Sequence, residues 1–236
     1  MAGESFGEVA ARLAKIGRRF YVRGWALGTS GNFSAVVSRR PLQLAITASS
    51  VPKDRLGAAD ILRCDGRGGI VERSDGHRPD STRRASSGHR SLARRRPSAE
   101  TLLHIEIARR RHAGAVLHTH SVWTTALSDL HASHGGLSID GYEMLKGLQG
   151  IGSHEHCEWI PIIENDQNMP RLARRVAETL ERFAGLHAFL LRRHGLYTWG
   201  DTLADAERHV EILEFLFETV GRTAIMSQAG RAGRVN

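Results

Sequence analysis

The chain has 236 residues, 41% of them hydrophobic, enough to bury the core of one sizeable α/β domain. Its formal net charge is +8, and no window approaches the 18 consecutive apolar residues of a transmembrane helix. The N-terminus lacks the apolar run and cleavage site of a signal peptide. Two cysteines, Cys64 and Cys157, do not form a disulfide framework, which predicts a reducing cytoplasm.

Much of the positive charge lies in one segment. Residues 75–96 contain seven arginines and two aspartates, a local charge of +5 that leaves +3 for the rest of the chain. Residues 74–96 are predicted to be disordered or an insertion in a single domain spanning 1–236, because Leu92 is their only large apolar side chain. A nucleic-acid-binding role would use these arginines, but 75–96 lacks aromatic residues for base stacking. We therefore expect neither a nucleic-acid nor a membrane partner.

Hydrophobic periodicity gives the expected elements in chain order. Apolar residues at spacings of three and four predict a helix over 4–23. Ser98 as N-cap and Glu100 in the first turn predict another over 99–112. Thr202 and Asp205 have the capping-box spacing of a helix start. The other expected elements are strands at 33–37, 42–47, 113–118, 156–163 and 187–192, a hairpin at 66–71, and helices at 143–148, 170–182 and 203–227.

The clearest chemical motif is the run AVLHTHS. Side chains alternate along a strand, so His118 and His120 point to the same face and can chelate one ion at about 2.0–2.1 Å. His194 ends another apolar strand, beside Gly195. Three neutral imidazoles would leave an open coordination position, as in catalytic zinc sites. These residues predict one zinc ion per subunit, although histidine also binds other divalent metals.

Other histidines offer weaker alternatives. His154 and His156 have the same spacing but precede a strand in a loop, so their geometry is less fixed. His131 and His134 flank a small polar loop and are expected to be solvated.

Two carboxylates and two polar loops are further candidates. Glu143 or Glu100 could move a proton beside a polarised carbonyl, although each could equally be a solvated or helix-capping residue. The loops at 28–32 and 47–50, with Lys53, could hold an anion through backbone N–H groups and charge. Such loops are usually only turns.

Taken together, the segments TSGNFS, ITASS, PSAETLLH, AVLHTHS, GYEMLKG, IPIIENDQ and RRHGLYTWG resemble the class II aldolase family over about 5–73 and 97–222. The resemblance implies a three-layer αβα fold with a central, mostly antiparallel sheet, where the periodicity alone suggests a parallel one. It also implies a homotetramer acting on a sugar phosphate.

Site residues follow from the resemblance. It places metal ligation on His118, His120 and His194, the principal acid/base on Glu143, and a second carboxylate on Glu100. Phosphate binding would fall to Ser30, Gly31, Asn32, Ser49, Ser50 and Ser98. Relatives commonly have glycine where this chain has Ser50, so this loop could be altered.

Within the family, GYEMLKG, IPIIEN and RRHGLYTWG are most similar to a dehydratase branch. That similarity implies a hydro-lyase acting on 5-methylthioribulose 1-phosphate in methionine salvage. Aromatic and Met side chains would form an apolar wall for the methylthio group, with Trp123, Tyr142, Met144 and Tyr197 as candidates. An aldolase or epimerase of the fuculose or ribulose phosphate type is the alternative, and an inactive relative is a third.

Overall fold

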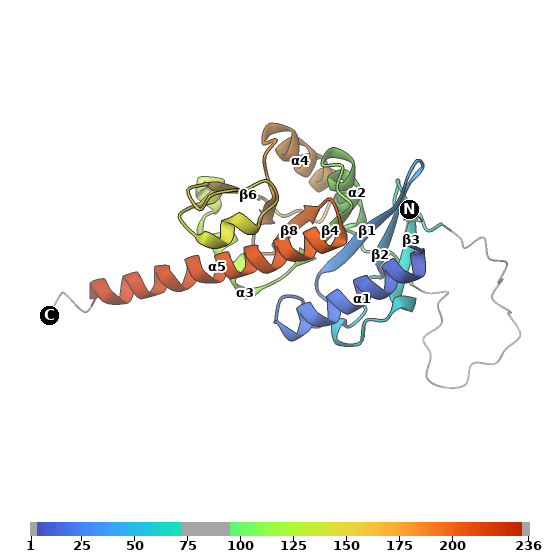
Figure 1. Cartoon of the computed structure of the whole chain (residues 1–236), viewed down its shortest axis with the longest axis horizontal. Helices are drawn as coiled ribbons and strands as arrows, with labels where there is room; N and C mark the ends of the chain where they lie inside the picture. Colours follow the sequence, from blue (N-terminus) through green and yellow to red (C-terminus); the bar gives the residue numbers. More distant parts are fainter. Residues whose placement is uncertain (1–3, 72–94, 233–236) are drawn as a thin grey trace, which may run out of the picture.

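A single eight-stranded sheet runs through the chain (Figure 1). The computed structural model describes residues 4–71 and 95–232. The strands are β1 (Asn32–Arg39), β2 (Leu42–Thr47), β3 (Ile61–Asp65), β4 (Ala115–Thr119), β5 (Gly136–Ile139), β6 (Glu158–Ile163), β7 (Ala188–Leu191) and β8 (Gly195–Gly200). Their order is β3-β2-β1-β4-β8-β7-β6-β5, and among them only β6 and β7 pair in parallel. The mostly antiparallel sheet is confirmed, and a parallel sheet is wrong.

Helices cover both faces of the sheet, which makes three layers. One outer layer contains α2 (Thr101–Arg110) and α4 (Met169–Arg182), packed on Val116 and Phe189. The other contains α1 (Phe6–Val22), α3 (Val122–Leu130) and α5 (Leu203–Ala232), packed on the opposite side chains of the same strands. The predicted three-layer αβα architecture is therefore confirmed.

Helix starts follow their capping residues. Ser5 and Glu8 cap α1 reciprocally, with hydrogen bonds of 2.7 and 3.3 Å. The capping-box prediction for Thr202 and Asp205 is confirmed, since each side chain accepts from the other's backbone N–H at 3.2 and 3.1 Å. The prediction of Ser98 as the N-cap of the helix expected from 99 is wrong: α2 begins at Thr101, and Glu100 is its N-cap residue without a side-chain capping bond. Ser98 instead accepts from the Glu100 N–H at 3.2 Å in the preceding turn.

Several elements were not predicted from the pattern. They are β3, α3, β5 and β8. The segment expected to be helical at 143–148 is the 3₁₀ helix η5 (Glu143–Gly147). In the described residues, no helix is both long and apolar enough to cross a bilayer. The segment predicted at 74–96 lies almost wholly in 72–94, outside the described residues.

Candidate active site

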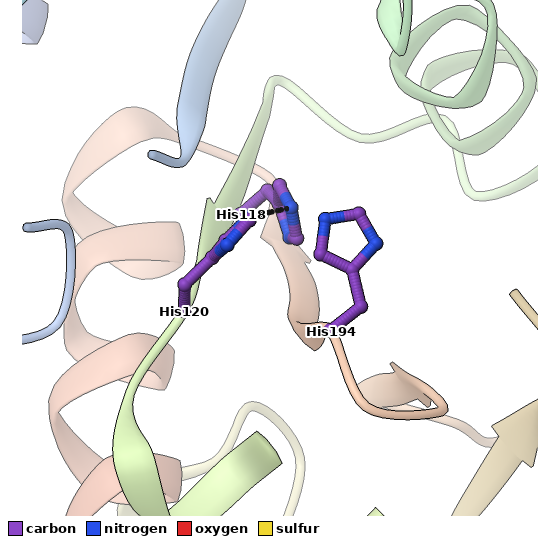
Figure 2. A group of neighbouring side chains, drawn as sticks. All are labelled: His118, His120 and His194. Carbon is purple, nitrogen blue, oxygen red and sulfur yellow. Dashed lines mark hydrogen bonds between the residues drawn. The ribbon is translucent and has the colours of Figure 1, made fainter. Parts of the chain in front are cut away.

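Three histidine rings converge where the central strands β4 and β8 meet, at one end of those strands (Figure 2). His118 lies in β4, His120 directly follows it, and His194 lies in the turn between β7 and β8. One ligand atom from each ring lies within 4.8 Å of the others. The sequence prediction that these distant histidines form one group agrees with this geometry.

Backbone packing explains why β8 lies so near β4 here. A Cβ on Gly195 would lie 2.0 Å from the Thr119 carbonyl oxygen, and one on Gly31 would lie 2.7 Å from that of His118. Gly31 also has a φ of +73°, which side-chain-bearing residues rarely adopt. Both glycines therefore let neighbouring chain segments approach the histidine pair.

The His118 ring is prepared to bind a metal through Nε2. Its Nδ1 donates to the Leu196 carbonyl oxygen at 2.8 Å, so the lone pair is on Nε2, which faces the His120 Nε2 at 2.7 Å. Tyr197 stacks on the far side of the ring, with centroids 3.9 Å apart. Burial, followed by the nearby His120 and His194, holds the pKa of His118 well below its usual value. Neutral rings with free lone pairs are what a divalent ion requires.

The other two histidines share this neutral character. Burial lowers the pKa of His120 to about 3 and also lowers that of His194. Within the described part of the chain, the buried His194 Nδ1 has no hydrogen-bond partner, so its ring is not fixed by one. The donor set fits a divalent ion such as zinc.

Glu100 is the carboxylate beside these rings. Its oxygens lie 3.6 Å from the His118 Nε2 and 3.3 Å from the His194 Nε2. The Asn32 amide nitrogen donates to Glu100, and to the Ser98 hydroxyl at 3.3 Å. The turn before α2 thus places a carboxylate beside the three histidines.

The structure does not bring Glu143 to this group within one chain. Its side chain is 73% exposed and pairs with Lys146 at 2.5 Å. The hydrogen bond and charge of Lys146 lower the Glu143 pKa. Its helix η5 packs through Leu145 among side chains that face α5, whereas His118 lies on the α2 side with Tyr197. Glu143 and the histidines therefore belong to opposite faces of the sheet.

A polar pocket adjoins the histidines. Its lining includes Glu100, His120 and His194, and all six residues predicted for phosphate binding: Ser30, Gly31, Asn32, Ser49, Ser50 and Ser98. Lys53 also lines it, and its ammonium donates to the Thr29 and Val51 carbonyl oxygens, each at 3.1 Å. Burial, opposed by Asp60, lowers the Lys53 pKa to about 8. Backbone, hydroxyl and ammonium groups therefore surround a space suited to an anion.

Ser50 shows the departure expected from the sequence. Its φ is +60°, a left-handed conformation that glycine adopts without strain. The loop thus keeps the backbone path of a glycine with a serine in its place.

The residues proposed for an apolar wall are not gathered in this pocket. Tyr197 is fully buried behind His118, so the prediction that its side chain forms part of the apolar wall is wrong. Trp123 lies against Gly221 of α5. Neither side chain lines the space beside Glu100.

The fold and site can now be compared with known proteins. The model of the class II aldolase and adducin N-terminal domain matches residues 11–220. The chain belongs to this family. Among curated class II aldolase relatives, "Methylthioribulose-1-phosphate dehydratase" of Methylococcus capsulatus is 43% identical, over 92% of this chain and 95% of that protein. The protein of the same name from Marinobacter nauticus is 39% identical, over 90% and 92%.

Solved class II aldolase structures share the fold. An L-fuculose-1-phosphate aldolase from Thermus thermophilus matches with a TM-score of 0.67 and 23% identity, covering 95% of this chain and 99% of that one. YgbL from Klebsiella pneumoniae, a putative aldolase, epimerase or decarboxylase, matches at 0.71 and 21%, covering 93% and 91%.

Sequence reasoning missed one buried side chain near the site. His104 lies in α2 with no exposed surface, and its ring contacts Asn32 and Ser34. The spacing of four from Glu100 puts both residues on one helix face, a signal present in PSAETLLH.

Proposed function

We propose that this chain dehydrates 5-methylthioribulose 1-phosphate to 2,3-diketo-5-methylthiopentyl 1-phosphate. The observation that carries the proposal is the joining of three neutral histidines and an anion-binding pocket in one site. Relatives named for this dehydratase, 39% and 43% identical over nearly the whole chain, support the choice of substrate.

The histidines would hold one divalent ion, and we propose zinc. His118, His120 and His194 would be its ligands. A bound ion supplies Lewis-acid polarisation of a ketose carbonyl at an open coordination position. The Leu196 carbonyl keeps the His118 ring oriented for that role.

The pocket would hold the substrate phosphate. The hydroxyl groups of Ser30, Ser49, Ser50 and Ser98 and the backbone N–H groups of Gly31 and Ser50 would donate to its oxygens. Lys53 would provide positive charge. Asn32 would act there through its amide while also bonding Glu100. Binding energy gathered at this end of the substrate positions the reacting carbons.

The reaction itself needs proton transfer at two neighbouring carbons. A base removes the proton from C3, and an acid gives a proton to the departing C4 hydroxyl. Water leaves, and the resulting enol ketonises to the diketone. Glu100 is beside the histidines, so we assign it proton transfer at C3 or the holding of a hydroxyl there.

We propose Glu143 as the principal acid/base, the role that the dehydratase resemblance implies. Because it is exposed on the opposite face of the sheet from the histidines, it would act at the site of a neighbouring subunit. A homotetramer, the assembly proposed for this chain, would allow such an arrangement. Two free cysteines, Cys64 and Cys157, fit the proposed cytoplasmic location.

The test is a dehydration assay on purified, metal-loaded protein. With 5-methylthioribulose 1-phosphate we expect the diketone and one water per turnover, and no dihydroxyacetone phosphate. L-Fuculose 1-phosphate tests the alternative, and His118→Ala is the control for adventitious activity. If dihydroxyacetone phosphate is released from either substrate faster than the diketone forms, the protein is an aldolase and the proposal is overturned.

A further inference from the structure

A chain of hydrogen bonds leads from Ser34 of β1, through His104 of α2, to the Glu100 carboxylate. The Ser34 hydroxyl lies 2.7 Å from the His104 Nδ1, the His104 Nε2 contacts the Asn32 Oδ1, and the Asn32 amide nitrogen contacts Glu100. The exposed fractions of Ser34, Asn32 and His104 are 0, 5 and 0%. Neither Ser34 nor His104 is among the residues proposed for metal binding, phosphate binding or proton transfer.

The direction of each bond follows from chemistry at the Glu100 end. A carboxylate oxygen only accepts, so Asn32 must turn its NH₂ group toward Glu100. Its Oδ1 then faces His104, and because Oδ1 also only accepts, the His104 Nε2 must carry a hydrogen.

The remaining ring nitrogen completes the chain. Burial, opposed by a hydrogen bond with the Val116 backbone, lowers the pKa of His104 to about 3, so the ring is neutral. With its one hydrogen on Nε2, the neutral ring has a bare Nδ1. The Ser34 hydroxyl can then donate to that nitrogen. The opposite tautomer would put a bare Nε2 against the Asn32 Oδ1, with no hydrogen between them.

We propose that His104 is a positioning residue of this site: its Nε2–H fixes the Asn32 amide, and that amide holds the Glu100 carboxylate against the histidines. The inference rests on the proposed function for its effect on turnover. An Asn32 amide released from His104 could rotate and present its oxygen to Glu100, which would push the carboxylate from its place. His104 itself touches neither the histidine ligands nor the pocket.

Two substitutions separate positioning from packing. Glutamine can place its amide nitrogen near the position of the histidine Nε2, whereas asparagine reaches only the Nδ1 position. For His104→Asn we expect kcat to fall about 10- to 100-fold, the effect typical of residues that orient a metal site, with KM changed less than about threefold. His104→Gln should recover kcat to within about fivefold of the wild type.

His209 provides a matched control. It is also buried, with its Nδ1 2.7 Å from the Trp199 carbonyl oxygen and its Nε2 3.0 Å from the Gln149 N–H, on the opposite layer of the protein. His209→Asn should lower the melting temperature about as much as His104→Asn while leaving kcat near the wild-type value. Equal kcat in the two asparagine variants, or no recovery by glutamine, would overturn the proposal.

A neutron crystal structure of the wild-type protein tests the same claim without activity. We expect a hydrogen on the His104 Nε2 and the Asn32 amide hydrogens facing Glu100. A hydrogen on Nδ1 alone would overturn the inference, even if no His104 variant folds. If the wild type fails to dehydrate 5-methylthioribulose 1-phosphate but shows this proton, the proposed function fails and the hydrogen-bond chain stands.

Discussion

Two buried clusters of histidine and glutamate differ in how their ring nitrogens are used. At the active site, His118 has a free Nε2, and burial keeps the ring neutral by lowering its pKa. In the second cluster, Glu158 lies 2.8 Å from the His156 Nε2 and 3.0 Å from the His187 Nδ1. The Nε2 of His187 bonds the Gln149 carbonyl oxygen at 2.8 Å.

Charge follows from those bonds. Burial alone would lower the His187 pKa, but the Glu158 hydrogen bond and charge raise it overall. Burial alone would raise the Glu158 pKa, and the bonds from His187 and His156 lower it. The second cluster is therefore an internal ion pair that ties Gln149 to the sheet. Similar residue types bind a metal only where lone pairs remain free.

Removing one histidine from the first cluster should have a larger effect than the other substitutions. His118→Ala should lower metal affinity more than about 100-fold, beyond the loss typical of a residue that only orients a ligand, and abolish turnover. Metal analysis after dialysis measures it. His156→Ala in the second cluster is the control and should keep the full metal content. Stoichiometric metal in His118→Ala would contradict the assignment of the ligands.

The next effect concerns the carboxylates. Glu143→Gln should keep its metal and lose about 10²- to 10⁴-fold in turnover, the contribution of a positioned acid or base. Steady-state kinetics with parallel metal analysis measure it. A near-wild-type rate in Glu143→Gln, with a collapse in Glu100→Gln, would move the principal role to Glu100. Hybrids of Glu143→Gln and His118→Ala subunits should regain activity if the carboxylate acts across subunits.

Breaking the second cluster should reduce stability without affecting the metal. Glu158→Gln should lower the free energy of unfolding by about 4 kcal/mol, as expected when one partner of a buried pair is removed. Because the Glu158 pKa is lowered, the contribution of this group to the free energy of unfolding is lost as pH falls below about 4.5. Because the His187 pKa is raised, the contribution of that group is lost as pH rises above about 6.5. Urea unfolding should therefore show the largest loss between these values, and a pH-independent loss would argue against an ion pair.

Glu214 is a third buried carboxylate, and its hydrogen-bond partners are hydroxyl groups instead of histidines. Burial raises the Glu214 pKa from 4.5 to about 7, although Ser121 and Thr119 hydrogen bonds oppose the shift. The folded protein holds this proton more tightly than the unfolded chain, so stability falls as pH rises from about 4.5 to about 7.

Glutamine removes that titration while keeping a similar shape. Glu214→Gln should match the wild type near pH 4.5 and be more stable above pH 7, by at most about 3 kcal/mol. Urea unfolding at pH 5 and pH 8 measures the difference. The exposed Glu178→Gln is the control and should show no such pH dependence. A Glu214→Gln variant that is destabilised at pH 8 would mean that the folded protein stabilises the ionised carboxylate, which contradicts a raised pKa.

Local features of this protein could be predicted from its amino-acid pattern. Strand periodicity put His118 and His120 on one face, and the capping-box spacing of Thr202 and Asp205 marked the start of α5. The motif resemblance predicted the mostly antiparallel sheet that the structure has, whereas periodicity alone suggested a parallel sheet. β5 escaped because it has only four residues, and β8 escaped because it is buried along its whole length and so shows no alternation of polar and apolar residues.

Only the tertiary structure decided which polar residues meet. Glu100 and Glu143 are equally good acids by residue type, yet the sheet separates Glu143 from the histidines within one chain and brings Glu100 against them. His104 reads as an ordinary helix residue until β1 places Ser34 and Asn32 at its two ring nitrogens. Long-range pairing fixes such contacts, because hydrogen-bond direction and burial depend on neighbours far away along the chain.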